Sequence, residues 1–167
     1  MYNMEAFECI RSRKSIRNYS KREVENEKIN NIIEAAICAP SGRNGQPWRF
    51  KIIREHTEVV KLCDFCDFEK WITRSKVIIL VFLDKACSYD YIKDMQSCGA
   101  AIQNMLLIAH DLGIGACWVG SVVNSANDIK ELLKISDDIE LAGMVTLGYE
   151  AIRTARTMRK GYETFLL

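Results

Sequence analysis

The sequence is poor in proline and histidine and has no long apolar run. It contains two prolines and two histidines among 167 residues. Neither His56 nor His110 neighbours a serine or cysteine in a nucleophile-elbow motif, so the pattern does not favour a Ser–His or Cys–His hydrolase. The longest apolar run, Val77–Leu83, is far shorter than the roughly 18 residues that a membrane helix needs. We therefore expect no membrane-spanning helix.

The composition is that of one soluble globular domain. Apolar residues make up 49% and charged residues 27%, and the net charge is +1, so nothing draws the whole chain toward nucleic acid or membranes. No basic and apolar leader opens the sequence, and we expect a cytoplasmic protein with a single domain over residues 1–167. The seven cysteines are expected to be reduced core thiols, and Cys63 and Cys66 lack the second pair that a structural zinc site requires.

Apolar spacing predicts helices and strands in irregular order. An apolar face over residues 29–37 predicts a helix with Asn26 as its N-cap and an end before Pro40. The run Val77–Leu83 predicts a strand buried on both faces. Residues 97–112 predict a helix that is apolar almost all round, buried in the core or against a partner subunit, with Gly113 at its end. Further helices are expected at 4–12, 57–75 and 128–135, and strands at 48–53, 116–120 and 141–147. Because helices and strands do not alternate regularly, we expect an α+β layered domain.

A basic turn near the start of the chain could bind an anion. Arg13, Lys14, Ser15 and Arg17 place three cations and a hydroxyl within five residues. Arginine and serine suit a phosphate dianion. A solvated charged face explains the same composition more simply, so this turn alone decides nothing.

The loop between the two prolines adds a second polar cluster. Pro40–Pro47 contains Ser41, Asn44 and Gln46 together with two glycines, and it leads into the strand expected at 48–53. Glycines let backbone approach a flat ligand closely, and amide side chains offer the donors and acceptors that an isoalloxazine edge requires. A plain connecting loop is the alternative.

Together, these segments resemble the FMN-dependent nitroreductase family. The resemblance rests on six stretches: Arg13–Arg17, Ile32–Ala36, Ala39–Phe50, Gly99–Leu107, Gly113–Gly120 and Arg159–Glu163. It implies a three-layer α+β sandwich, with helices on both faces of a mostly antiparallel sheet. It also implies an intertwined homodimer with FMN at the interface. Three departures stand out: Lys14 replaces the usual arginine or histidine, Gly161 replaces a common proline, and the chain is short, which implies a more open pocket.

The resemblance assigns cofactor contacts residue by residue. The FMN phosphate and ribityl chain would be held by Arg13, Lys14, Ser15 and Arg17, with Arg159 and Lys160 closing on the phosphate. The loop of the other subunit would contribute Pro40, Ser41 and Asn44, with Gln46 in the same loop. The flavin ring would be lined by Trp118, Val119, Gly120 and Ser121. No side chain is expected to act as a catalyst, because flavin N5 carries the hydride.

The activity implied is an NAD(P)H-dependent reductase. NADH or NADPH would pass a hydride through FMN to a nitroaromatic, a quinone or another flavin by a ping-pong mechanism. A flavin-binding or carrier protein without turnover would show the same binding residues. A nucleic-acid-binding domain using the basic clusters is less favoured, because acidic residues flank the first cluster and no aromatic platform accompanies it. We expect neither nucleic-acid nor membrane binding.

Overall fold

A central antiparallel sheet organises the chain. The computed structural model describes residues 4–66 and 69–167. Within them, four strands follow the order β1-β2-β4-β3, and each neighbouring pair is antiparallel. The strands are β1 (Trp48–Ile53), β2 (Val77–Asp84), β3 (Gly115–Val119) and β4 (Ile139–Gly148). The sheet confirms the α+β class and its mostly antiparallel character.

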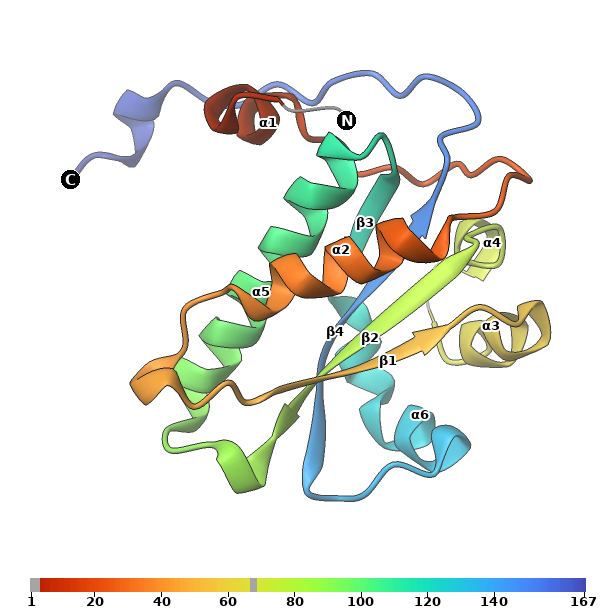
Figure 1. The fold of residues 1–167 in the computed structure, drawn as a ribbon, viewed down its shortest axis with the longest axis vertical. Helices are drawn as coiled ribbons and strands as arrows, with labels where there is room; N and C mark the ends of the chain where they lie inside the picture. Colours follow the sequence, from red (N-terminus) through yellow and green to blue (C-terminus); the bar gives the residue numbers. More distant parts are fainter. Residues whose placement is uncertain (1–3, 67–68) are drawn as a thin grey trace.

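Helices cover both faces of this sheet (Figure 1). On β2, Val77, Ile79 and Val81 belong to the apolar core shared with α2 (Asn26–Ile37) and α5 (Tyr91–Asp111). The alternate residues Ile78 and Leu80 belong to a second core, shared with three shorter helices: α3 (His56–Cys63), α4 (Glu69–Ile72) and α6 (Ala126–Leu133). Because successive side chains of a strand point to opposite faces, β2 builds both cores, as its uninterrupted apolar run predicted.

Helix α5 is longer than its apolar pattern indicated. It begins at Tyr91, six residues before the predicted start, because Asp90 caps it by accepting a hydrogen bond from the backbone N–H of Lys93 at 3.1 Å. In the first turn Tyr91, Ile92 and Lys93 are exposed and only the polar Asp94 is buried, so the turn shows no buried apolar face. Gly113 ends the helix as predicted, with φ of +71°. Neither α5 nor any other helix in the described ranges is long and apolar enough to cross a membrane.

Other boundaries also differ from the predictions. Glu25, not Asn26, is the N-cap of α2, and the Asn26 side-chain oxygen accepts a hydrogen bond from Arg54 instead. The single helix expected over residues 57–75 is divided into α3 and α4. Strand β3 and helix α6 lie one and two residues earlier than expected. The prediction that all cysteines are core thiols was wrong for Cys38 and Cys87, which are exposed.

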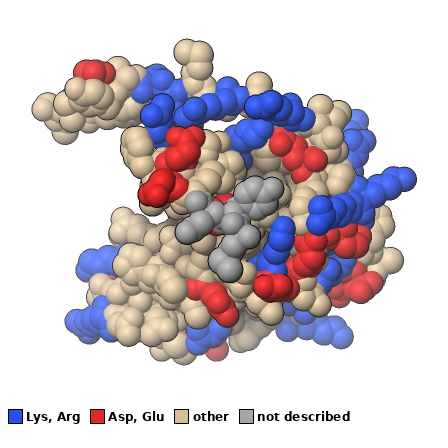
Figure 2. Space-filling view, turned by 45° about the horizontal axis from the view of Figure 1, so that its top comes forward, with Lys and Arg blue, Asp and Glu red and all other residues tan. Residues whose placement is uncertain are grey.

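The two ends of the chain run close together. After β4, the C-terminal tail passes back over the molecule toward α1 (Ala6–Ser12) and continues beyond it (Figure 1). Lysine and arginine side chains form a row along the upper edge of the surface, where the tail runs (Figure 2). The tail and α1 also expose large apolar side chains, with Phe7 70%, Met158 92% and Phe165 69% exposed.

Candidate functional site

The basic turn is fixed against the sheet edge. Ser15 forms a parallel bridge with Ala116 of β3, and the backbone N–H of Ile16 donates to the Ala116 carbonyl oxygen at 2.9 Å. A Cβ on Gly115 would lie 2.8 Å from the Ile16 side chain, so the close approach of turn and strand requires glycine there. The backbone of residues 13–17 is therefore held by a strand rather than free in solvent.

Arg13 and Arg159, from opposite ends of the chain, lie near enough for their charges to act on each other. Burial lowers the pKa of Arg13, and the positive charge of Arg159 lowers it further. Neither guanidinium forms an ion pair with a carboxylate within residues 4–66 and 69–167. Arginine remains protonated in proteins, so both keep their charge. Two neighbouring guanidiniums without a counter-ion favour a multiply charged anion such as phosphate.

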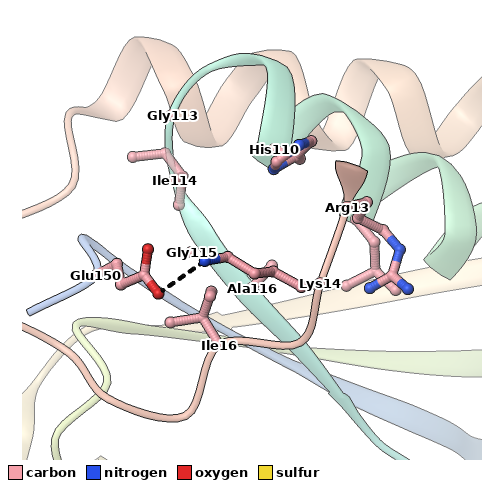
Figure 3. Close-up of a pocket in the computed structure, with 10 residues that line it drawn as sticks. Arg13, Lys14, Ile16, His110, Gly113, Ile114, Gly115, Ala116 and Glu150 are labelled. Carbon is pink, nitrogen blue, oxygen red and sulfur yellow. Dashed lines mark ion pairs between the residues drawn. The ribbon is translucent and has the colours of Figure 1, made fainter. Parts of the chain in front are cut away.

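Lys14 has a partner of its own. Its Nζ lies 3.3 Å from the Glu150 carboxylate, as the dashed line in Figure 3 shows, and it donates to the carbonyl oxygen of Thr154. Burial raises the pKa of Glu150, but hydrogen bonds from Thr154 and Lys14 outweigh that effect and lower it. Lys14 therefore anchors the start of the tail, and Lys160 lies exposed further along that tail.

A small cavity behind the turn contains a histidine that the sequence did not indicate. The cavity has a volume of about 190 Å³, and Arg13, Lys14, His110 and Glu150 line it (Figure 3). His110 Nε2 lies 2.8 Å from the hydroxyl of Ser12, which itself donates to the carbonyl oxygen of Glu8 at 2.6 Å. The hydroxyl has one proton, so it accepts from His110. Burial, and then the charges of Arg13 and Lys14, lower the pKa of His110.

Arg17 lies at the other end of the turn. Its guanidinium is 5.9 Å from the centre of the Trp71 ring, and no carboxylate among the described residues pairs with it. Burial raises the pKa of the neighbouring Cys117 thiol, and the charge of Arg17 opposes this. Arg17 thus offers an uncompensated cation between α4 and β3, next to the turn's phosphate-binding candidates.

The corner after β3 offers open space to a flat ligand. The Trp118 side chain is 41% exposed and packs on Gly99 and Gly143, while Val119 is buried. A Cβ on Gly120 would meet no atom within 4 Å, and its φ of −78° suits any residue. Nothing in this chain therefore requires glycine at 120. Ser121 begins the short turn η3 (Ser121–Ser125) directly afterwards.

The loop between the prolines lies far from Arg13 within one chain. Pro40 and Ser41 line a shallow pocket with Ala100 of α5, whereas Arg13 lines the cavity beside His110. Ten residues of helix separate Ala100 from His110, which is about 15 Å at the usual rise. The loop is well defined: Ser41 Oγ accepts from the backbone N–H of Gln46 at 3.0 Å, and Asn44 and Gln46 have positive φ. One chain thus does not assemble all the predicted contacts.

Comparison with known proteins identifies the family. A family model described as "Nitroreductase family" matches residues 10–67 and 67–149, which is most of the chain.

The chain belongs to the nitroreductase family.

Individual relatives agree with this membership. A protein of Archaeoglobus fulgidus named "Putative NADH dehydrogenase/NAD(P)H nitroreductase" is 36% identical, over 87% of this chain and 85% of the relative. An "FMN reductase [NAD(P)H]" of Bacillus subtilis is 25% identical, over 93% and 70% of the two chains. A crystal structure from Desulfovibrio desulfuricans, described as a "putative nitroreductase in complex with fmn", matches with a TM-score of 0.92 and 36% identity, over 99% of this chain and 96% of the other.

In this nitroreductase-family chain, a buried carboxylate supports the proline-bracketed loop. Asp94 is fully buried, and its Oδ2 accepts hydrogen bonds from the Ser88 hydroxyl at 2.8 Å and from the backbone N–H groups of Tyr89 and Asp90. Burial raises the pKa of Asp94, but these hydrogen bonds lower it further than burial raises it. The Tyr89 ring in turn fills the space above Gly42, where a Cβ would lie 2.1 Å away. Sequence patterns do not reveal Asp94, because its partners are a nearby serine hydroxyl and local backbone groups.

Proposed function

We propose that this chain is an FMN-dependent oxidoreductase that takes hydride from NADH or NADPH and passes it by a ping-pong mechanism to a small acceptor, such as a nitroaromatic, a quinone or a flavin. The proposal is carried by Arg13, which stands on a turn held against β3, pairs with no carboxylate among the described residues and feels the positive charge of Arg159, because such a site favours a phosphate dianion. The FMN complex of the Desulfovibrio relative and the name of the Archaeoglobus relative support it.

The residues present fit FMN. Arg13 and Arg159, with Lys160 next to it, would hold the phosphate, and Ser15 would face the ribityl chain. The open corner at Gly120 leaves room for the ring beside Trp118. FMN supplies an N5 atom that accepts and releases a hydride.

The chain's own groups would orient and polarise the bound ring. Arg17 lies within 5.9 Å of the Trp71 ring centre and has no carboxylate partner among the described residues. Its cation would favour negative charge on the adjacent edge of the ring. Val119 and Ser121 flank Gly120 and would set the height of the ring, while the exposed indole of Trp118 would limit water on one side.

We propose that the working unit is a homodimer with the cofactor at the interface. The loop residues Pro40, Ser41, Asn44 and Gln46 lie about 15 Å along α5 from the Arg13 end, so a second copy would have to supply them. The large apolar side chains that α1 and the tail expose are unusual for a monomer and would be covered by that copy.

Subunit mixing tests the shared site. Arg13→Ala and Asn44→Ala chains, each impaired alone, should recover about a quarter of wild-type activity after mixing, because half of the random dimers carry one intact site of two. Mixing Arg13→Ala with Arg159→Ala is the matched control: both arginines lie in the same half-site, so no intact site forms. Recovery in both mixtures, or in neither, would contradict the interface arrangement.

Steady-state oxidation of NADPH or NADH by the FMN-loaded protein tests the enzyme itself. Addition of a quinone or nitroaromatic acceptor should accelerate donor oxidation. A protein that retains FMN but turns over neither donor would instead be a flavin carrier.

A further inference from the structure

A basic cleft lies beside the Arg17–Trp71 contact and is separate from the Arg13–Arg159 pair. Its volume is about 460 Å³, and three segments of the chain line it. The lining residues are Tyr19, Ser20, Lys21, Glu23, Arg54, His56, Thr73, Arg74, Ser75 and Lys76. Four of them are lysine or arginine and one is a carboxylate, so the cleft attracts anions.

Two of the cations are held in place. Lys76 Nζ lies 2.7 Å from Glu23, and Arg54 donates to the Val24 carbonyl oxygen at 3.0 Å and to Asn26. Each keeps N–H donors to spare, because a lysine has three and an arginine five. The single lining carboxylate, that of Glu23, is therefore already paired with Lys76. It does not neutralise the two remaining cations of the cleft.

Those two cations, Lys21 and Arg74, are exposed. Neither side chain forms a hydrogen bond or ion pair with the rest of the described chain.

The start of a helix adds partial positive charge to the same cleft. His56 begins α3, and its N-cap Glu55 makes no side-chain capping bond, so the first backbone N–H groups of that helix are left without a side-chain partner. Glu55 is exposed and does not line the cleft.

Two chain segments connect the Arg17–Trp71 contact with the cleft. Tyr19 follows Arg17 by two residues, and Thr73 follows Trp71 by two, so both segments lead from the Arg17–Trp71 contact into the cleft within about 7 Å of chain. A dinucleotide whose nicotinamide lay on the ring would carry its phosphates outward from that contact. Phosphate is the anion that lysine and arginine at such a cleft would bind.

We propose that this cleft binds the phosphate groups of the nicotinamide dinucleotide donor. The inference rests on the proposed function. Two sources of phosphate are possible: the pyrophosphate, which NADH and NADPH share, and the additional ribose phosphate of NADPH.

The test compares donor kcat/KM in the FMN-loaded wild type and in the Lys21→Ala/Arg74→Ala double variant. We expect a loss of roughly fivefold or more, because two charge contacts to phosphate disappear, and the loss should shrink as salt rises. Equal losses for both donors would assign the pyrophosphate, and a loss confined to NADPH would assign the ribose phosphate. The Lys51→Ala/Lys61→Ala variant is the matched control, because it removes two exposed cations outside the cleft.

A phosphate-free donor separates this idea from an effect on the flavin. With 1-benzyl-1,4-dihydronicotinamide, the difference between wild type and the double variant should disappear, and FMN content should be equal. An unchanged kcat/KM for both NADH and NADPH, or an equal loss with the phosphate-free donor, would overturn the assignment while leaving the proposed function intact. Absence of turnover with all donors in the wild type would instead remove the proposed function.

Discussion

Replacing Arg13 with glutamine should affect cofactor binding and the stability of the cofactor-free protein in opposite directions. In the cofactor-free chain, burial and the charge of Arg159 both disfavour the Arg13 cation, as its lowered pKa indicates. Glutamine removes that charge and keeps part of the side chain's packing. The melting temperature of the cofactor-free variant should therefore equal or exceed that of the wild type.

FMN binding should suffer in the same variant. A hydrogen bond between charged groups contributes about 1.5–3 kcal/mol, so losing the Arg13 contact to phosphate should raise the FMN Kd by roughly 10- to 150-fold. Because Arg13 is half-buried, the upper part of that range is the better expectation.

The assay combines FMN titration by fluorescence quenching with thermal unfolding of the cofactor-free protein. Arg153→Gln is the matched control: it removes an exposed tail arginine that has no ion pair in the described chain, so both measurements should stay close to wild type. The reasoning is refuted if Arg13→Gln lowers the melting temperature and leaves the FMN Kd unchanged, since Arg13 would then be a structural residue.

Three further predictions follow from individual residues. Gly120→Ala should leave the free energy of unfolding unchanged or raise it by roughly 0.4–1 kcal/mol, because a Cβ there meets nothing in the chain. Gly120→Val should weaken FMN binding. Gly115→Ala should instead lower the urea midpoint, because its Cβ would collide with Ile16. The pKa of His110 is lowered in the folded chain, so its contribution to stability is present above the unfolded-state pKa of about 6.5 and is lost as pH falls toward the folded pKa. The urea midpoint should therefore drop less on acidification in His110→Gln than in wild type. An identical drop in the two proteins would count against this role. Asp94→Ala should cost about 2 kcal/mol or more of stability and should also weaken FMN binding, because Tyr89 supports the Pro40–Pro47 loop. Cys98→Ala, a buried change on the same helix, should lower stability alone. Equal FMN affinities in the two variants would exclude a positioning role for Asp94.

The sequence predicted those elements whose signal is periodic. Strand β1 has the predicted bounds, and β2 is buried on both faces because its residues alternate between two apolar cores. The start of α5 was missed, since its first turn buries only the polar Asp94 and is fixed by a cap at Asp90 rather than by apolar spacing. Asn26 has the side chain of a good cap, but Arg54, distant in sequence, engages it.

The candidate site was predictable in its parts but not in its assembly. The basic turn could be located from its residues, yet its approach to Arg159 depends on the path of a tail without regular structure. Trp71 and His110 gave no sequence signal, because a contact with Arg17 or Ser12 forms only after folding.

Anaerobic addition of NADPH or NADH to the FMN-incubated, desalted protein tests the central proposal most directly. The proposal predicts that the protein retains FMN, that its visible flavin band bleaches with the donor, and that the band returns when a quinone or nitroaromatic is added. A protein that leaves the column colourless, or one whose flavin band persists with both donors, would contradict it.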